Sequence, residues 1–271
     1  MKHWTLTLCA LSILGNIHGT AHADDVLKAA VAGSQRTPAF VARDVWRHPV
    51  ETLSFMGIKP DMTVVEISPG AGWYTEILAP YLRDRGQLIL AASNPASNSE
   101  YSRRSAERLK KKLDAQPTIY DKVKLGVFEP PAQLSYAPPS TADLVLTFRN
   151  VHNWAANGEA VTKAVFQSMY DTLKPGGVLG VVDHRLPPNR QLDPKFENGY
   201  VHVAYVLRIA QSVGFKLQDQ SEINANSKDT ADHLGGVWAL PPTYANKDQD
   251  RVRFDTIGES DRMTLKFVKP R

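Results

Sequence analysis

A glycine-containing turn after a short apolar segment carries the clearest candidate chemistry of the chain. In the segment VVEISPGAGWY, Glu66 precedes two glycines, Gly70 and Gly72, and a helical pattern begins directly after them. Glycines let a ligand approach the backbone closely, and a helix N-terminus presents free N–H groups to a polar or negatively charged group. Within a strand–turn–helix unit, this arrangement is typical of a site for a nucleotide-containing cofactor.

Two classes of cofactor compete for this turn. A dinucleotide favours a third glycine or alanine, where this chain has Thr75, and an acidic residue after the second strand, where it has Ala92-Ser93-Asn94. Both differences count against NAD. The acidic Glu66 inside the motif fits a cofactor with an amino-acid tail better. An NAD-dependent oxidoreductase is therefore the less favoured alternative.

A second polar cluster, residues 149–154 (RNVHNW), follows another predicted strand. In open α/β sheets, ligands bind at the carboxyl ends of the strands, so Arg149, Asn150 and His152 are the candidate catalytic residues. His152 could act as a general base, because an unperturbed imidazole titrates near neutral pH. A purely structural histidine is an equal alternative, with its neighbours capping loops and Trp154 packing on the core.

Further polar residues lie at element ends. Asp183-His184-Arg185 ends the fifth predicted strand beside the same crevice, where Asp183 could orient His184, either residue could touch substrate, or Asp183 could form a salt bridge with Arg185. His48 precedes a proline and could cap a helix or line the site.

A group of acidic residues and a histidine lies in a long loop near the end of the chain. Asp229, Asp232 and His233 could ligate a hard metal, but their spacing matches no known metal-binding loop. They are expected to be solvated loop residues, and no metal site is predicted. The sequence also lacks the G-x-S-x-G, H-E-x-x-H and P-loop motifs, which leaves hydrolase, zinc-protease and kinase functions without support.

Alternating strands and helices must position these residues, and such alternation predicts a parallel sheet with helices on both faces. The predicted strands are residues 62–67, 87–92, 122–128, 143–148, 178–182, 215–222 and 263–268. The predicted helices between them are residues 73–82, 99–113, 159–173 and 200–213. Residues 24–59 are expected to form N-terminal helices with breaks at Thr37-Pro38 and His48-Pro49. The loop of residues 224–260 is too long for a hairpin and is expected to be ordered and packed.

The composition is that of a globular protein. The 271 residues are 42% hydrophobic and 22% charged, with a formal net charge of +4. Apart from the short Arg108–Lys112 stretch there is no basic block, and phosphate binding usually needs a concentrated one. Nucleic acid is therefore not an expected partner.

The first residues have the pattern of a secretory signal peptide. Lys2 precedes an apolar run too short to span a bilayer, and Ala21-His22-Ala23 follows as a small-residue cleavage site. Cleavage after Ala23 would remove Cys9, the only cysteine, and leave a protein without thiols or disulfides. The sequence thus predicts a periplasmic or secreted protein without stable membrane insertion.

Four segments together resemble the class I S-adenosylmethionine-dependent methyltransferases, and more narrowly an exported bacterial group of predicted methyltransferases. The segments are RHPVETLSFMGIKPDMTVVEISPGAGWYTEILAPYL, TADLVLTFRNVHNW, LKPGGVLGVVDHR and SEINANSKDT. The resemblance covers nearly all of the chain after the signal. It implies a seven-stranded, mostly parallel, doubly wound (Rossmann-like) α/β sheet with N-terminal helices and an antiparallel last strand, in a domain at residues 60–271.

The resemblance also implies roles for individual residues. Glu66 and the turn would hold the methionine end of S-adenosylmethionine, Asn94 the ribose and Glu129 the adenine. Arg149 and Asn150 would border the transferable methyl group. The full set implied for the cofactor is Glu66, Ser68, Pro69, Gly70, Gly72, Trp73, Asn94 and Glu129. Two positions depart from the usual pattern, because Ser68 replaces a glycine and Asn94 replaces an acid.

The leading functional hypothesis is thus a methyltransferase that acts on a small polar acceptor, with His152 as the base. The alternative is an exported, non-catalytic ligand-binding or accessory protein that retains the fold, which Ser68 and Asn94 favour. The acceptor and the oligomeric state cannot be predicted from the sequence.

Overall fold

A computed structural model describes residues 17–271, with side chains from Asp24 onward. The chain forms one seven-stranded sheet with the order β3-β2-β1-β4-β5-β7-β6. Only β7 runs against the others, pairing antiparallel with both β5 and β6, as predicted. The strands are β1 (Thr63–Ile67), β2 (Gln87–Ala92), β3 (Lys124–Val127), β4 (Ala142–Phe148), β5 (Leu173–His184), β6 (Lys216–Ser221) and β7 (Arg262–Val268).

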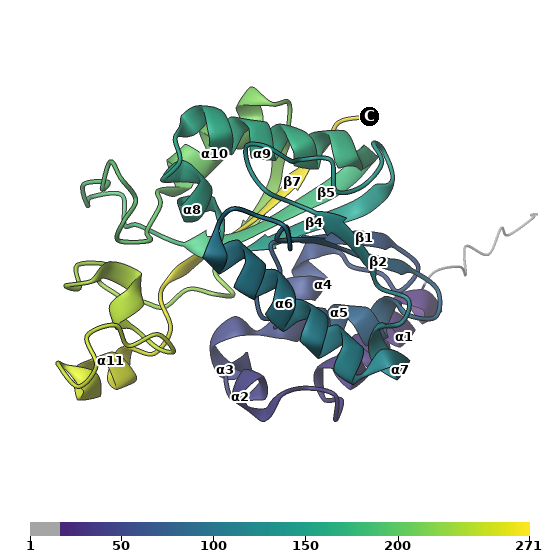
Figure 1. Cartoon of the computed structure of the whole chain (residues 1–271), viewed down its shortest axis with the longest axis horizontal. Helices are drawn as coiled ribbons and strands as arrows, with labels where there is room; N and C mark the ends of the chain where they lie inside the picture. The colour runs from purple at the N-terminus through teal and green to yellow at the C-terminus, as the bar shows by residue number, and fades with distance from the viewer. Residues whose placement is uncertain (1–16) are drawn as a thin grey trace, which may run out of the picture.

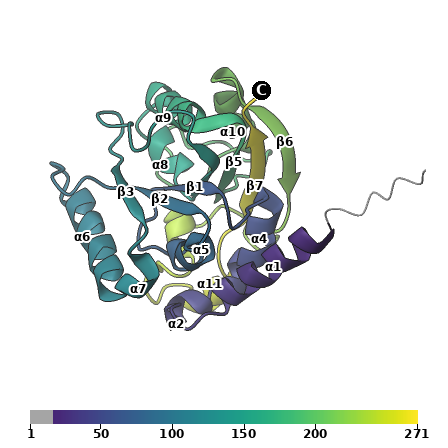
Figure 2. The ribbon, with the colours of Figure 1, turned by 90° about the vertical axis from the view of Figure 1, so that its right-hand side faces the viewer.

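Helices cover both faces of this sheet (Figures 1 and 2). One face carries α8 (Val151–Ala155), α9 (Glu159–Thr172) and α10 (Val203–Ser212). The other carries α1 (Ile17–Val31), α4 (Pro49–Met56) and α5 (Thr75–Leu82), while α6 (Glu100–Ala115) lies beyond the β3 edge. The remaining short elements are α2 (Pro38–Val41), α3 (Asp44–Arg47), α7 (Pro117–Tyr120), the 3-10 helix η1 (Gly236–Ala239) and α11 (Arg251–Ile257).

Two cores, one on each face, follow from the alternation of side chains along the central strands. In β1, Val65 and Ile67 pack with Phe166 of α9, whereas Val64 packs with Ile77 of α5 on the opposite face. A strand with both faces covered reads as a continuous apolar run. The apolar run of β1 was therefore detectable in the sequence.

Two expectations about element boundaries need correction. The fifth strand was predicted to begin at Val178, but β5 begins at Leu173 and includes the Lys174–Gly177 segment, with an irregularity opposite residues 142–144. The first helix after the glycine turn begins at Thr75 instead of residue 73, because residues 70–74 form the turn itself. The N-terminal helices break at the predicted prolines, and residues 224–260 are ordered around η1 and α11.

The predicted signal peptide lies mainly outside the described residues, which begin at Ile17 inside α1. Cleavage after Ala23 therefore stays a prediction. Among the helices described, none has both the length and the apolar composition needed to cross a bilayer.

Candidate active site

The site lies where β1 and β4, the two central parallel strands, reach their carboxyl ends. Ser68 and Arg149 follow these strands, and both have left-handed backbone conformations, with φ of 51° and 62°. Such a conformation costs a residue with a Cβ atom roughly 1–2 kcal/mol, and backbone strain of this kind clusters at functional sites. Asn150 ties the two ends together, because its Nδ2 donates to the carbonyl oxygen of Ile67 and to Thr147 Oγ1.

Two adjoining cavities open at these strand ends. One, of about 440 Å³, extends along β2 and α6, and the other, of about 230 Å³, extends toward the N-terminal helices. The residues that line both are Ser68, Pro69, Gly70, Tyr101, Asn150 and Asn153. The turn after β1 thus forms a shared wall, so a ligand bound against it could reach into both cavities.

Glu66 lines the smaller cavity from inside the protein. The residue is 2% exposed, and its carboxyl group accepts one side-chain hydrogen bond, from Thr75 Oγ1 at 2.7 Å. Burial raises the pKa of Glu66 to about 7, against which the hydrogen bond from Thr75 acts weakly. Thr75, which stands where a dinucleotide site has its third glycine, therefore orients this carboxyl group.

The two glycines of the turn have different roles. Both have positive φ, 58° for Gly70 and 80° for Gly72. A Cβ atom on Gly70 would meet no atom within 4 Å, and Gly70 lines both cavities. A Cβ atom on Gly72 would lie 3.1 Å from the Lys112 side chain, and Gly72 lines neither cavity. Gly72 therefore shapes the turn, whereas Gly70 keeps the shared wall flat.

We expect Gly70→Ala and Gly72→Ala to separate these roles. Both variants should lose about 1–2 kcal/mol of stability, because alanine is strained in a left-handed conformation. Only Gly70→Ala should also lose affinity for a ligand of the two cavities, by about tenfold or more. Urea unfolding and calorimetric titration with S-adenosylhomocysteine measure the two effects. Equal affinity losses in both variants would contradict the assignment.

Asn94 and Glu129 lie together at the ends of β2 and β3. Asn94 Nδ2 donates to Glu129 Oε2 at 2.7 Å, and Ser97 Oγ donates to Glu129 Oε1. These hydrogen bonds, from Ser97 first and then Asn94, lower the pKa of the Glu129 carboxyl. Neither residue lines the two cavities, although the neighbouring Ser93 lines the larger one.

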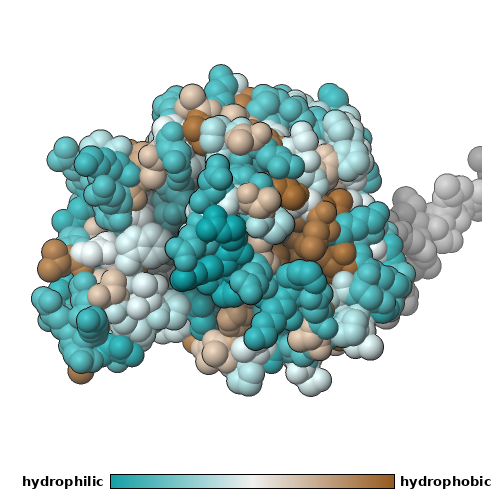
Figure 3. Space-filling model, viewed as in Figure 1, coloured by the Kyte–Doolittle hydropathy of each residue, from teal (hydrophilic) through white to brown (hydrophobic). Residues whose placement is uncertain are grey.

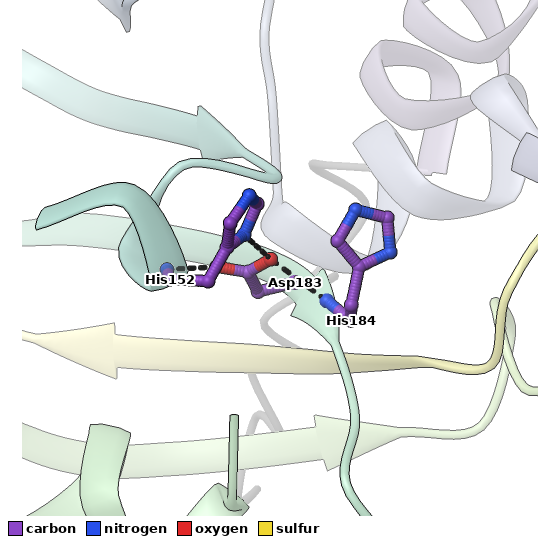
Figure 4. Close-up of side chains that lie close together, drawn as sticks. All are labelled: His152, Asp183 and His184. Carbon is purple, nitrogen blue, oxygen red and sulfur yellow. Dashed lines mark hydrogen bonds and ion pairs between the residues drawn. The ribbon is translucent and has the colours of Figure 1, made fainter. Parts of the chain in front are cut away.

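His152 and Asp183 form a buried pair at the inner end of the smaller cavity (Figure 4). His152 Nδ1 lies 2.9 Å from Asp183 Oδ1, and the His152 backbone N–H donates to Oδ2 at 3.1 Å. Because a carboxylate can only accept, Nδ1 is the nitrogen that donates, which leaves Nε2 as the ring nitrogen that can accept. His152 Nε2 is buried and has no hydrogen-bond partner among the described residues. This is the arrangement of an oriented general base.

The contacts of Asp183 differ from those that the sequence suggested. Asp183 accepts a hydrogen bond from the backbone of His184, but it orients the side chain of His152. Arg185 pairs with Asp261 at 2.7 Å, not with Asp183. His184 Nδ1 lies 2.5 Å from Ser260 Oγ. Burial, followed by the charges of neighbouring groups, holds the pKa of His184 well below its usual value, so this ring is neutral.

The same three residues offer atoms that a metal ion could use, all within 4.8 Å of one another. Asp183, however, already accepts three hydrogen bonds from backbone and ring nitrogens. Arg47 and Arg149 both act on this region through their positive charge, which raises the free energy of a divalent cation. We therefore interpret His152 and Asp183 as an acid–base pair.

The smaller cavity also has walls that the sequence did not predict. Arg43 and Arg47 reach it from the N-terminal helices, and Trp238 reaches it from η1. The ring centroid of Trp238 lies 5.6 Å from that of His152. Trp73 lies between the guanidinium groups of Arg36 and Arg47, at 4.9 and 4.7 Å. Besides the cofactor role that the resemblance implies, Trp73 therefore also has a structural role, because it attaches the N-terminal helices.

The loop residues expected to be solvated are partly buried. Asp229 accepts hydrogen bonds from Tyr200 Oη at 3.0 Å and from the backbone of Asp261 at 2.8 Å, and it lies 2.9 Å from His233 Nε2. This network attaches the loop to the start of β7. Only Asp232 matches the expectation, pairing with Arg190 at the surface.

Two further features lie outside the site. The His48 side chain neither caps α4 nor lines either cavity. A hollow of about 660 Å³ with mostly apolar walls lies between α6 and β3. Figure 3 shows hydrophobic side chains gathered on the face that carries α6.

No known family model matches the chain, and no curated protein matches it in sequence. Solved structures do match its fold. A methyltransferase from Aquifex aeolicus described as SAM dependent has a TM-score of 0.56 at 14% identity, covering 91% of this chain and 98% of its own. The N-methyltransferase NodS from Bradyrhizobium japonicum WM9, in complex with S-adenosyl-L-homocysteine, has a TM-score of 0.52 at 14% identity, covering 92% and 99%.

A further match differs in its named reaction. The [4+2]-cyclase SpnF has a TM-score of 0.59 at 13% identity, with 93% of this chain and 95% of its own covered. A fold alone does not determine a reaction, so the chemistry must be argued from the site. The sheet order, the turn after β1 and these matches together establish that the chain has the fold of the class I S-adenosylmethionine-dependent methyltransferases.

Proposed function

We propose that this protein transfers a methyl group from S-adenosylmethionine to a small acceptor with an O–H or N–H nucleophile. The observation that carries the proposal is the shared wall at Gly70. On one side of it lies a cavity large enough for much of a nucleoside, and on the other lie Glu66 and His152. A cofactor that crosses the wall would bring its methyl group to the cavity that contains the base.

The residues present fit this cofactor. Glu66 is a buried carboxyl with spare acceptor capacity, as the ammonium group of the methionine end requires. Ser68, Pro69 and Gly70 would contact the chain between sulfur and ribose. Glu129 supplies a carboxylate beside Asn94, where the fold usually has an acid after the second strand. Ser68 keeps the left-handed backbone that a glycine would adopt, which weakens the argument for an inactive, purely ligand-binding protein.

The chemistry divides between cofactor and protein. When bound, the cofactor supplies a methyl group on a sulfonium, which passes to the attacking atom while the C–S electron pair stays on sulfur. His152 Nε2 would accept the proton of the nucleophile, and Asp183 would stabilise the resulting imidazolium. Alignment of nucleophile and methyl can lower the barrier by roughly 7–11 kcal/mol.

The proposal includes a location and an acceptor class. The N-terminal pattern supports export to the periplasm or medium, with cleavage after Ala23. The smaller cavity, of about 230 Å³, supports a small-molecule acceptor. The moderate net charge of +4 gives no support to nucleic acid as the acceptor.

Calorimetric titration of the purified chain with S-adenosylmethionine, S-adenosylhomocysteine and NAD tests the cofactor. We expect micromolar binding of the first two and none of NAD at millimolar concentration. Absence of S-adenosylmethionine binding at millimolar concentration would overturn the methyltransferase proposal. Binding without release of S-adenosylhomocysteine across a broad acceptor screen would favour the non-catalytic alternative.

A further inference from the structure

Three arginines pair with a single carboxylate behind the smaller cavity, and a fourth acts on it through its charge. Arg43 Nε and Arg47 Nε donate to Glu259 at 2.5 and 3.1 Å, and Arg262 Nη1 forms an ion pair with it at 3.1 Å. Arg149 is the fourth member, and no ion pair among residues 24–271 includes it. We call these residues, without Glu259, the arginine cluster.

The arginine cluster has unused hydrogen-bond donors. Arg43 Nη2, Arg47 Nη2 and Arg262 Nε are buried and have no partner among the described residues. Arg43, Arg47 and Arg149 line the smaller cavity, and Arg47 is only 1% exposed. Donors that are buried without a partner cost free energy, which a ligand with acceptor oxygens would recover.

The charges in this region do not balance. Burial alone would raise the pKa of Glu259, but the arginines lower it to about 2, so it is fully ionised. Burial, and the like charges of the neighbouring arginines, lower the pKa of Arg149 to about 10, which still leaves it protonated at neutral pH. Among residues 24–271, the four guanidinium groups of the cluster thus have a single ion-pair partner, Glu259. An anion in the cavity would be strongly favoured, because buried charges need partners.

The cofactor alone cannot supply this balance. S-adenosylmethionine carries one carboxylate, but also an ammonium and a sulfonium, so its binding adds positive charge. After it binds, Arg149 and Arg43 would still lack a further anionic partner, because Asp183, the carboxylate beside His152, already accepts three hydrogen bonds. The missing anion must then come from the acceptor.

We propose that the methyl acceptor is a small carboxylate held by Arg149 and Arg43, with its nucleophilic O–H or N–H group directed at His152. The inference rests on the proposed function. Guanidinium groups form strong hydrogen bonds with carboxylates. Arg43 offers its unused Nη2 at this cavity, and Arg149 lines the same cavity without an ion pair among residues 24–271. The aromatic side chains of the cavity would contact the apolar part of the acceptor, and they are Phe40, Trp73, Tyr74, Tyr101, Phe148 and Trp238.

Matched pairs of acid and amide test the inference. The chain, saturated with S-adenosylhomocysteine, is titrated with benzoate and benzamide, 4-hydroxybenzoate and 4-hydroxybenzamide, and 3-hydroxybenzoate and 3-hydroxybenzamide. We expect at least one acid to bind ten or more times as tightly as its amide. If no acid binds more tightly than its amide, the inference is overturned.

Variants locate the effect. Arg149→Asn should abolish the preference for the acid, and asparagine tolerates the left-handed backbone at this position. Arg43→Gln is a second variant that removes a partly exposed member, should Arg149→Asn fail to fold. Arg208→Gln is the control, because this exposed arginine pairs with Glu159 away from the site. A preference that survives in both cavity variants would overturn the inference.

The cofactor carboxylate is the competing occupant, and decarboxylated S-adenosylmethionine distinguishes it. If the arginine cluster serves the acceptor, removing the cofactor carboxylate should weaken binding less than tenfold, and Arg149→Asn should leave S-adenosylhomocysteine affinity within threefold. A loss above 100-fold in both measurements would assign the cluster to the cofactor and overturn the inference. Failure of S-adenosylhomocysteine to bind at all would instead be a failure of the proposed function.

Discussion

Glu66→Gln should weaken S-adenosylmethionine binding about 100-fold and, at the same time, stabilise the free protein at pH 8. The loss of affinity follows because glutamine cannot provide a negative charge for the ammonium group, and removing one partner of a buried charge pair costs about 2–5 kcal/mol. The gain in stability follows from the raised pKa of Glu66, about 7 in the folded protein against 4.5 for the free side chain. Glutamine keeps the oxygen that accepts from Thr75 without the buried charge.

The pH dependence has a definite sign. Between pH 4.5 and 7 the folded protein holds a proton on Glu66 that the unfolded chain has released. The stabilising contribution is therefore complete below pH 4.5 and is lost as the pH rises through 7, by about 3 kcal/mol in total. Urea unfolding from pH 4 to 8 should show this loss in the unchanged protein and not in Glu66→Gln.

Glu107→Gln, on the exposed side of α6, is the matched control for Glu66→Gln. It should alter neither the affinity nor the pH profile. Unchanged cofactor affinity in Glu66→Gln would remove this carboxyl from the binding site. An identical pH dependence in the two glutamine variants would show that the Glu66 carboxyl does not titrate near neutrality.

Asp183→Asn and His152→Ala should each lower kcat by about 10³, within the range of 10²–10⁴ that general bases contribute, with cofactor affinity retained. In Asp183→Asn, the new amide can donate to His152 Nδ1. The ring proton then moves to Nε2, which can no longer accept a proton. The measurement is turnover of the acceptor identified by screening, together with nitrogen NMR of the His152 tautomer.

The pH profile separates this role from a structural one. If Asp183 only supported the fold, its replacement would lower kcat without moving the acidic limb of the profile. If Asp183 is the partner of the base, its replacement should displace the acidic limb to lower pH, because the imidazolium loses a stabilising negative charge. His202→Ala, which changes a histidine outside both cavities, is the control. An unshifted limb with the original tautomer would refute the pairing.

The sequence predicted those parts of the site that depend on local pattern. The apolar run of β1, the turn after it and the polar cluster at residues 149–154 all lie at the carboxyl edge of the sheet, as expected. Asp183 was also expected at this edge. Its partner was not, because the choice between His152 and His184 depends on the register of β4 and β5 and on the direction of each side chain, which the spacing does not encode.

The remaining walls of the smaller cavity depend on contacts between distant segments. Arg43 directly precedes the short helix α3 and Arg47 ends it, in a segment whose sequence resembles any solvated amphipathic one. Glu259 and Trp238 lie in a loop without periodicity. Nothing local distinguishes a buried loop residue such as Asp229 from a solvated one. Burial there is set by the side chains that the fold brings to it, here Tyr200 and His233.

The pairing of Glu259 with Arg43 and Arg47 joins residues separated by 216 and 212 positions. Loops of this length close late in folding, because their closure entropy must be overcome before the contact forms. During synthesis the sheet can begin to assemble while the smaller cavity still lacks a wall. A ligand in that cavity would contact both the early and the late parts of the chain. Its binding would therefore slow the local unfolding of both parts and protect the N-terminal helices from proteases.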